Sequence, residues 1–287
     1  MRIAYLILCH KNPAQVKALI NQLNNGTSDF YLHVDKKTAI TDFILKKDNV
    51  FYVNENEREN IKWASFEMVS ATIKLMKMAK KSNIRYDYII LLSGQDLPIK
   101  SNKDIHKYLE EHQGVNFIEV LDHSHKNYQK YLKRNAIRYY KWMFSDSAFI
   151  KALKKLYILI TGGHYYTIPI FKRKKPFNFE FEFGSQWWAF TYECFCWILD
   201  YIDSNSDFSK FYQNSLTADE SFFQTLFMAS PYKNQRNSRL TYLEMGRNHP
   251  RVFTKEEYGA LVYEHTELFA RKFDFVLDND ISIMIKD

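Results

Sequence analysis

"RIAYLIL" (Arg2 to Leu8), "KNPAQVKALINQL" (Lys11 to Leu23) and "FYLHVD" (Phe30 to Asp35) follow one another at the start of the chain and decide its fold class. The first and third stretches are mainly apolar runs of strand length, which is typical of buried strands. Between them, Pro13 stands where the first turn of a helix accepts proline. A strand, a helix and a second strand in this order predict parallel pairing and an α/β fold.

The alternation of strand and helix continues outward from this unit. We expect a single domain over 287 residues, built on a mainly parallel sheet flanked by helices, with ligands at the carboxyl ends of the strands. The patterns predict strands at 49–53, 88–92 and 116–121, helices at 65–82 and 102–112, helical pieces within 126–155, strand-like alternation at 178–191, a helix at 192–201 and a last long helix at 254–274.

Composition limits the class of protein. The three cysteines, Cys9, Cys194 and Cys196, are an odd number without CxxC spacing, so they predict no disulfide framework and favour a reducing cytoplasm. No run of about 18 apolar residues and no signal-peptide pattern occurs, so we expect no membrane span.

The chain is basic, with a formal net charge of +7 and a dense cluster at Lys172 to Lys175. Such a cluster is typical of a solvated loop, but it could also dock peripherally on the anionic inner face of a membrane or bind a phosphorylated substrate. Nucleic-acid binding is not expected, because no zinc-finger spacing or RNA-binding aromatic motif accompanies the charge.

Polar residues end three of the predicted strands: His10 in "CHKN", Asp35 in "HVDKK" and Asp96 in "SGQD". These loops should form the ligand crevice, although ordinary strand-end polarity is the alternative. A metal-dependent nucleotide-sugar site uses Asp-x-Asp to hold a divalent ion, and here Asp96 stands alone. His123 and His125 lack a third ligand at a recognisable spacing. The sequence therefore predicts no metal site.

Two acids lie side by side in "SLTADESFFQTLF" (Ser215 to Phe227). Thr217 and Glu220 have the spacing of a capping box, in which each side chain satisfies an amide of the first helical turn. The alternative is that Glu220 is a catalytic base and that Asp219 or Thr217 caps the helix.

Two basic residues stand at either end of the predicted last helix, Arg251 in "HPRVF" and Lys272 in "ARKFD". Without a metal, a diphosphate needs Arg or Lys for charge neutralisation. Spacing alone does not distinguish them from ordinary surface cations.

Taken together and in order, "IAYLILCH", "FYLHVDKK", "YDYIILLSGQDLPIKS", "GSQWWAFTYE", "ADESFF", "HPRVFTKEE" and "ELFARKFD" resemble the core-2/I-branching β-1,6-N-acetylglucosaminyltransferase family, which also contains protein xylosyltransferases. The likeness runs from Ile3 to Asp274. It implies a glycosyltransferase A-type, Rossmann-like fold and an inverting enzyme that uses a UDP-sugar without a metal or other cofactor. The animal members' many cysteines and N-terminal membrane anchor have no counterpart here, which suggests a bacterial cytoplasmic relative.

The resemblance also implies residue roles. Glu220 matches the family's catalytic base, and Arg251 with Lys272 matches its basic pair on the diphosphate. The remaining nucleotide-sugar contacts would be His10, Asp35, Trp63 and the lone Asp96, and the acceptor contacts would be Glu119, Arg134, Arg138 and one or both of Trp187 and Trp188.

Within the single domain, residues 1–122 would then bind the nucleotide sugar and residues 123–287 would bind the acceptor and carry the base. The expected donor is UDP-N-acetylglucosamine, ahead of UDP-xylose, UDP-glucose and UDP-galactose. The expected acceptor is a glycan or lipid-linked glycan of a bacterial surface polysaccharide or lipopolysaccharide. The alternatives are a catalytically silent glycan- or polyanion-binding protein on the same fold and a metal-dependent nucleotidyltransferase.

Overall fold

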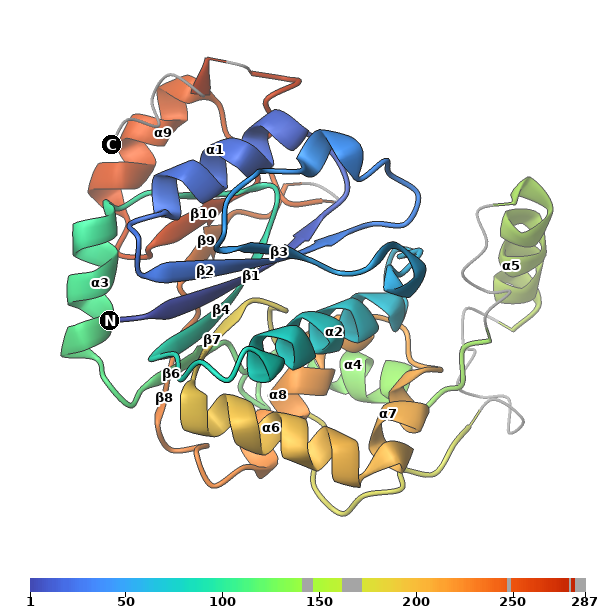
Figure 1. The fold of residues 1–287 in the computed structure, drawn as a ribbon. Helices are drawn as coiled ribbons and strands as arrows, with labels where there is room; N and C mark the ends of the chain where they lie inside the picture. Colours follow the sequence, from blue (N-terminus) through green and yellow to red (C-terminus); the bar gives the residue numbers. More distant parts are fainter. Residues whose placement is uncertain (141–146, 162–171, 247–248, 279, 282–287) are drawn as a thin grey trace.

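A seven-stranded mixed sheet runs through the centre of the molecule (Figure 1). The computed structural model describes residues 1–140, 147–161, 172–246, 249–278 and 280–281. The sheet has the order β3-β2-β1-β4-β7-β6-β8, and β7 alone among these strands runs against its neighbours. The strands are β1 Ile3–Cys9, β2 Ser28–Val34, β3 Val50–Tyr52, β4 Tyr88–Ser93, β6 Asn116–Ile118, β7 Trp188–Thr191 and β8 Arg236–Asn237. The predicted α/β class with a mainly parallel sheet is confirmed.

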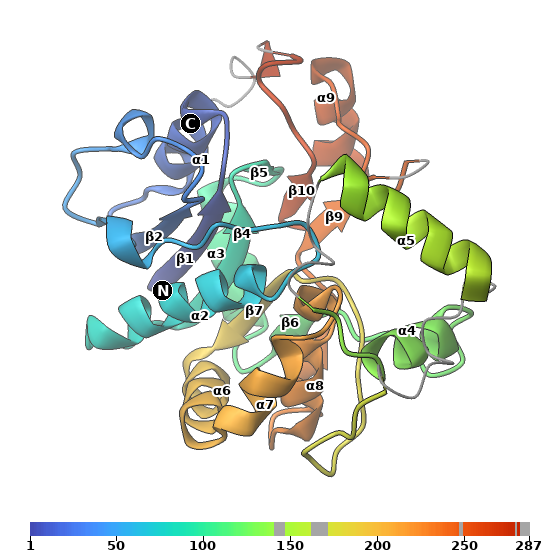
Figure 2. The ribbon, with the colours of Figure 1, turned by 90° about the vertical axis from the view of Figure 1, so that its right-hand side faces the viewer.

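Helices cover both faces of this sheet (Figures 1 and 2). One face carries α1 and α3, and the other carries α2, α6 and α8. The helices are α1 Pro13–Leu23, α2 Glu67–Lys81, α3 Asn102–Glu111, α4 Tyr128–Asn135, α5 Ala148–Thr161, α6 Tyr192–Ser204, α7 Ser206–Tyr212, α8 Phe222–Ala229 and α9 Lys255–Glu264, with short 3-10 turns η1 Thr41–Phe43, η2 Glu55–Glu57 and η6 Ala218–Glu220.

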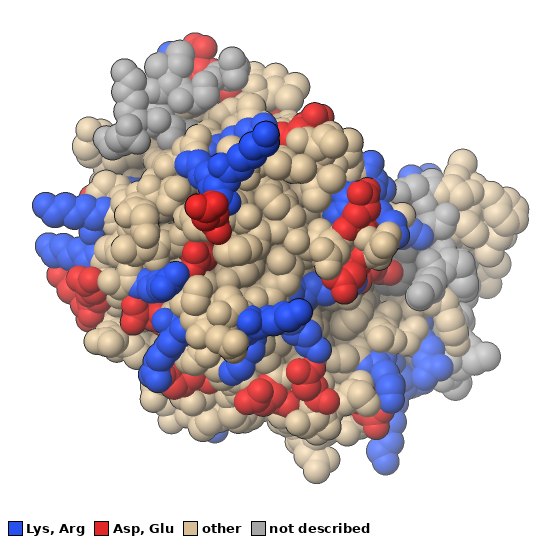
Figure 3. All heavy atoms as spheres, in the orientation of Figure 1, with Lys and Arg blue, Asp and Glu red and all other residues tan. Residues whose placement is uncertain are grey.

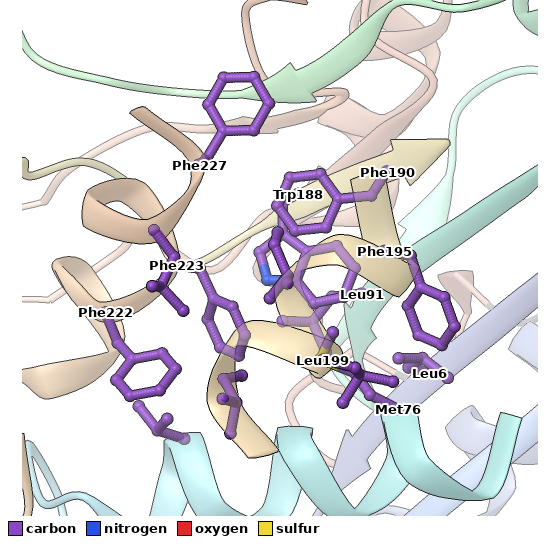
Figure 4. Packing of buried hydrophobic residues seen from close by; sticks show 14 of the residues in the cluster. Leu6, Met76, Leu91, Trp188, Phe190, Phe195, Leu199, Phe222, Phe223 and Phe227 are labelled. Atoms are coloured by element: carbon purple, nitrogen blue, oxygen red, sulfur yellow. The ribbon is translucent and has the colours of Figure 1, made fainter. Parts of the chain in front are cut away.

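Each face of the sheet has its own hydrophobic core because successive strand side chains point to opposite faces. In β1, Leu6 belongs to the core under α2 and α6, whereas its neighbours Tyr5 and Ile7 belong to the core under α1. Figure 4 shows the first core, in which the Trp188 ring of β7 stacks on Phe190 at 4.2 Å between ring centroids. Both faces are covered, which explains why the strands read as continuous apolar runs.

The chain after residue 264 leaves the helix and forms a short strand, so the prediction of one helix over 254–274 is wrong. α9 ends at Glu264, and β10 (Phe269–Arg271) joins a second sheet of order β5-β10-β9, with β5 Asp96–Pro98 and β9 Thr241–Leu243. Burial of Phe269 and its pairing with Pro98 decide this outcome, and both depend on residues far away in the sequence.

Two other local predictions are corrected. The capping box at Thr217 is absent, because Thr217 has a left-handed backbone (φ 51°) and its hydroxyl donates to the Leu216 carbonyl; α8 begins only at Phe222. The strand-like alternation of 178–191 yields strand only at β7. A capping box does form at α9, between Thr254 and Glu257.

Candidate active site

A cavity of about 300 Å³ opens at the carboxyl ends of β1, β2 and β4, where the parallel topology places a ligand. The loops after these strands supply much of its wall. The lining includes four of the predicted residues, His10, Asp35, Trp63 and Trp187, together with Cys9, Lys37, Thr38, Ser93, Gln95, Gln186 and Arg271.

Asp35 positions the wall that carries Trp63. One Asp35 carboxylate oxygen accepts from the Lys37 amide at 2.9 Å and the other accepts from the Ile61 amide at 3.3 Å. The Trp63 side chain, two residues beyond Ile61, is 80% exposed at the cavity. An exposed indole beside a held carboxylate suits stacking on a base and hydrogen bonding to a ribose.

His33 supports the same loop from beneath. Its Nε2 accepts a hydrogen bond from the Glu59 amide at 2.8 Å, which requires the neutral imidazole. Burial lowers the pKa of His33 to about 4, against the opposing charges of Asp35 and Glu59.

Acid should therefore destabilise the protein through His33. Between pH 6.5 and 4 the unfolded chain binds a proton that the folded chain does not, so stability is full above pH 6.5 and falls as the pH falls. At pH 4.5 the loss should be roughly 2 kcal/mol relative to pH 7. Thermal unfolding at both pH values should show a smaller difference for His33→Gln, while the partly exposed His125→Gln should behave as wild type. An unchanged pH dependence in His33→Gln would contradict the assignment.

Arg271 is a site residue that sequence reasoning missed. Its guanidinium carbon lies 4.2 Å from the centre of the Trp187 ring, it lines the cavity, and its Nη1 is buried without a hydrogen-bond partner. The sequence did offer a signal, because Arg271 adjoins Lys272 in "ARKFD". In the predicted helix, however, adjacent side chains point in different directions, so only Lys272 was assigned to the site. A guanidinium that lines a cavity and keeps a buried Nη1 without a hydrogen-bond partner is suited to a phosphate group.

Asp96 lies outside the cavity lining, which corrects its prediction as a nucleotide-sugar contact. It is fully buried and accepts from the Ser93 amide at 2.8 Å and the Ser93 hydroxyl at 2.9 Å. Burial raises its pKa, and the charge of Arg271, whose Nε lies 3.7 Å away, opposes that shift. Asp96 therefore holds Arg271 from behind the site.

Arg251 and Lys272 are neighbours in the structure, because residues 269–271 form β10 and not the end of a helix. The Lys272 amide donates to the Arg251 carbonyl at 3.3 Å. The Arg251 guanidinium itself pairs with Glu244 at 3.1 Å and with Glu257. Lys272 is half-buried, and its pKa is lowered by burial and then by the charges of Lys11 and Arg271. The two predicted cations are thus joined by one backbone hydrogen bond, and the positive charges near Lys272 are those of Lys11 and Arg271.

The segment after β10 contacts the start of α1 and the loop after β4. The Phe273 amide donates to the Gln95 carbonyl at 2.9 Å, and the Gln15 side chain donates to the Phe273 carbonyl at 3.1 Å. Lys11 pairs with Asp274 at 2.5 Å. The loops after β1, β4 and β10 are therefore locked to one another around the cavity.

Glu220 lies at the carboxyl end of η6 with its side chain 44% exposed. Its carboxylate accepts from the Arg134 guanidinium at 3.1 Å, and Arg134 lies 4.6 Å over the Tyr131 ring. The adjacent Asp219 carries a buried oxygen without a partner, and burial followed by the Glu220 charge raises the Asp219 pKa to about 7. Of the two acids, Glu220 is the one whose carboxylate is accessible.

Gly184 connects Glu220 to Glu119, the predicted acceptor-side acid. The Gly184 amide donates to the Glu220 carbonyl at 2.9 Å, and a Cβ at Gly184 would overlap the Glu119 carbonyl oxygen. The Glu119 carboxylate accepts from the Ser185 amide at 2.9 Å and pairs with Arg239, a second residue that the sequence did not reveal. The backbones at Glu119 and Glu220 are thus both held by close contact with Gly184, where two chain segments cross.

The two tryptophans have different surroundings. Trp187 lines the cavity beneath Arg271, whereas Trp188 is 2% exposed and packs against Phe190 and Phe223 (Figure 4). The prediction of Trp188 as an acceptor contact is therefore corrected. Arg138 is exposed, and its charge lowers the pKa of Arg173 after the larger effect of burial; its predicted acceptor role stays a prediction.

Part of the basic cluster faces inward. Arg173 lies 3.7 Å over the Phe211 ring and donates to the Asn135 carbonyl at 3.1 Å. Lys175 donates to the Phe179 carbonyl at 2.6 Å. Only Lys172 and Lys174 of the four are exposed.

Within the described ranges, no three His, Cys, Asp or Glu side chains gather where they could hold a metal ion. His123 instead pairs with Glu182 at 3.1 Å. Metal independence stays a prediction. In the same part of the chain, no helix has the length and apolar character needed to span a membrane.

Residues 3–265 match the family model described as Core-2/I-Branching enzyme. The chain belongs to the Core-2/I-branching enzyme family. This family member is 26% identical over 202 residues to the human probable β-1,3-galactosyl-O-glycosyl-glycoprotein β-1,6-N-acetylglucosaminyltransferase 7, a match that covers 66% of this chain and 41% of the human protein. The zebrafish (Danio rerio) enzyme 4 of that name is 23% identical over 308 residues, 96% of this chain and 67% of the relative. Rat xylosyltransferase 1 is 22% identical over 244 residues, 80% of this chain and 26% of the relative.

Proposed function

We propose that this family member is a metal-independent, inverting glycosyltransferase that moves a sugar from a UDP-sugar to a glycan hydroxyl. The observation that carries the proposal is the accessible Glu220 carboxylate, held by Arg134 and tied through Gly184 to Glu119. A cavity at the strand ends accompanies it, lined by an exposed indole and by the Arg271 guanidinium, whose buried Nη1 has no hydrogen-bond partner among the described residues.

In this mechanism Glu220 accepts the proton of the acceptor hydroxyl as its oxygen bonds to the anomeric carbon, and the bond from that carbon to the diphosphate breaks. The diphosphate leaves with added negative charge, which Arg271 and Lys272 stabilise in this mechanism. Arg134 is a positioning residue, because its guanidinium donates to the Glu220 carboxylate and orients it.

The names of the relatives support the donor class. They are N-acetylglucosaminyltransferases and xylosyltransferases. We therefore favour UDP-N-acetylglucosamine, with UDP-xylose next. The chain spans less than half the length of the human relative, so the acceptor, the bacterial polysaccharide role and the cytoplasmic location belong to the proposal.

A thermal-shift screen of UDP-sugars in EDTA tests the donor site. A bound donor at about 100 times its Kd should raise the melting temperature by roughly 5 °C. Lys272→Ala should remove most of that shift, because a half-buried cation leaves the diphosphate site. Lys255→Ala is the matched control, because Lys255 is a cation at the start of α9 that pairs with Asp280. A shift that needs Mg²⁺, or one that survives Lys272→Ala, contradicts the proposed site.

A further inference from the structure

The helix α5 projects from the body of the molecule (Figure 1). It lies on the side toward which β1 points, and Figure 2, which looks at that side, shows it in front of the other elements. No described side chain of α5 belongs to either hydrophobic core. A helix of 14 residues is marginal by itself in water, so α5 needs a partner surface.

One face of α5 is an exposed apolar stripe. Phe149, Leu153, Leu156 and Ile160 follow the spacing of 0, 4, 7 and 11 residues, which places them within about 60° of one another around the helix. They are 70%, 42%, 56% and 75% exposed, respectively. The same geometry places the exposed Lys155 on the opposite side of the helix. An apolar stripe opposite lysines is the pattern of a helix that lies in a membrane interface.

The charge of the surrounding chain selects the kind of surface. Residues 123–179, which contain α4, α5 and the basic cluster, carry 13 of the 40 Lys and Arg but one of the 33 Asp and Glu. Their formal charge is therefore +12, and that of the remaining chain is −5. In Figure 3, Lys and Arg side chains gather below the mainly tan projection of α5. This stretch complements an anionic surface, whereas the rest of the protein does not.

We propose that the α5 stripe inserts into an anionic lipid bilayer, with exposed lysines of this stretch, among them Lys155, Lys172 and Lys174, bound to its headgroups. Phe149, Leu153, Leu156 and Ile160 lie in the acyl boundary, and lysine side chains extend back to the headgroups. The carboxyl edge of the sheet, with the cavity, then lies on the side of the molecule that faces the bilayer. Membrane binding is independent of sugar transfer, so the proposal does not depend on the proposed function.

Flotation with vesicles tests this proposal on the whole chain. Wild type should bind vesicles of phosphatidylglycerol and phosphatidylcholine, should bind pure phosphatidylcholine weakly, and should lose binding as salt rises. Phe149→Ser with Ile160→Ser should lower the partition coefficient on the order of 100-fold, because two large apolar side chains leave the bilayer.

Val276→Ser with Leu277→Ser is the matched control, since these side chains are 80% and 72% exposed elsewhere on the surface; it should bind as wild type. Melting temperatures verify that both double variants fold. The proposal is overturned if wild type ignores anionic vesicles, or if the α5 double variant binds them unchanged. A second copy of the chain could instead cover the stripe. The proposal is therefore also overturned if wild type is a dimer without vesicle binding and only the α5 double variant is a monomer.

Discussion

Glu220→Gln is expected to lower the turnover number by about 10²- to 10⁴-fold while the protein still binds its donor. The amide keeps the shape of the side chain and can still contact Arg134, but it cannot accept the acceptor proton. The proposed donor site is the cavity at the strand ends, whose lining does not include Glu220, so the thermal shift with UDP-sugar should be retained. Steady-state rates and melting temperatures on the same preparations separate the two effects.

Glu193→Gln is the matched control for this experiment. Its side chain is 48% exposed, against 44% for Glu220, and it pairs with one arginine, Arg85. Glu193 lies on α6, does not line the cavity and has no hydrogen bond to Glu220, Arg134 or Glu119. Its change to Gln should therefore leave the rate unchanged. If Glu220→Gln retains full transfer activity, the base is another group. If no transfer occurs in wild type and UDP-sugar binding is unaffected by the change, the chain is a silent binding protein on this fold.

Gly184→Ala is expected to lower the free energy of unfolding by roughly 3 to 5 kcal/mol. The added methyl group meets the Glu119 carbonyl oxygen, which is backbone and cannot swing aside. Relief requires the two chain segments to separate, which also breaks the bond from the Gly184 amide to Glu220. Any folded fraction should transfer sugar slowly, because Glu220 and Glu119 move together.

Gly259→Ala provides the contrast, since a Cβ at Gly259 in α9 meets no atom within 4 Å. Alanine favours a helix over glycine by up to about 1 kcal/mol, so this variant should be slightly more stable than wild type. Chemical denaturation of both variants measures the difference. Equal stability of Gly184→Ala and wild type would show that the crossing at Glu119 is not tight in solution.

Much of the architecture was predictable from local sequence. The β1, α1 and β2 unit, the helix α2, the buried strand β4 and the helix α6 lie close to their predicted positions, because hydrophobic periodicity and Pro13 agree with the tertiary environment there. The polar strand ends also identified His10 and Asp35 as cavity residues, because parallel strands bring their carboxyl ends to one edge.

The same local rules failed where long-range pairing overrode them. Residues 254–274 have helical character, yet Phe269 pairs with Pro98 and Thr241 and becomes part of a strand. The missed role of Arg271 follows from this, because its contacts with Trp187 and Asp96 exist only once β10 lies between β5 and β9.

The sequence by itself therefore determined the α/β class, the edge of the sheet at which the cavity opens and the family of the chain, since these depend on periodicity and on ordered motifs. The tertiary structure alone decided that Arg251 and Lys272 are neighbours, that Trp187 and not Trp188 lines the cavity, and that Gly184 ties Glu220 to Glu119. Each of these facts is a contact between residues distant in sequence, and local propensity carries no information about which distant segment supplies the partner.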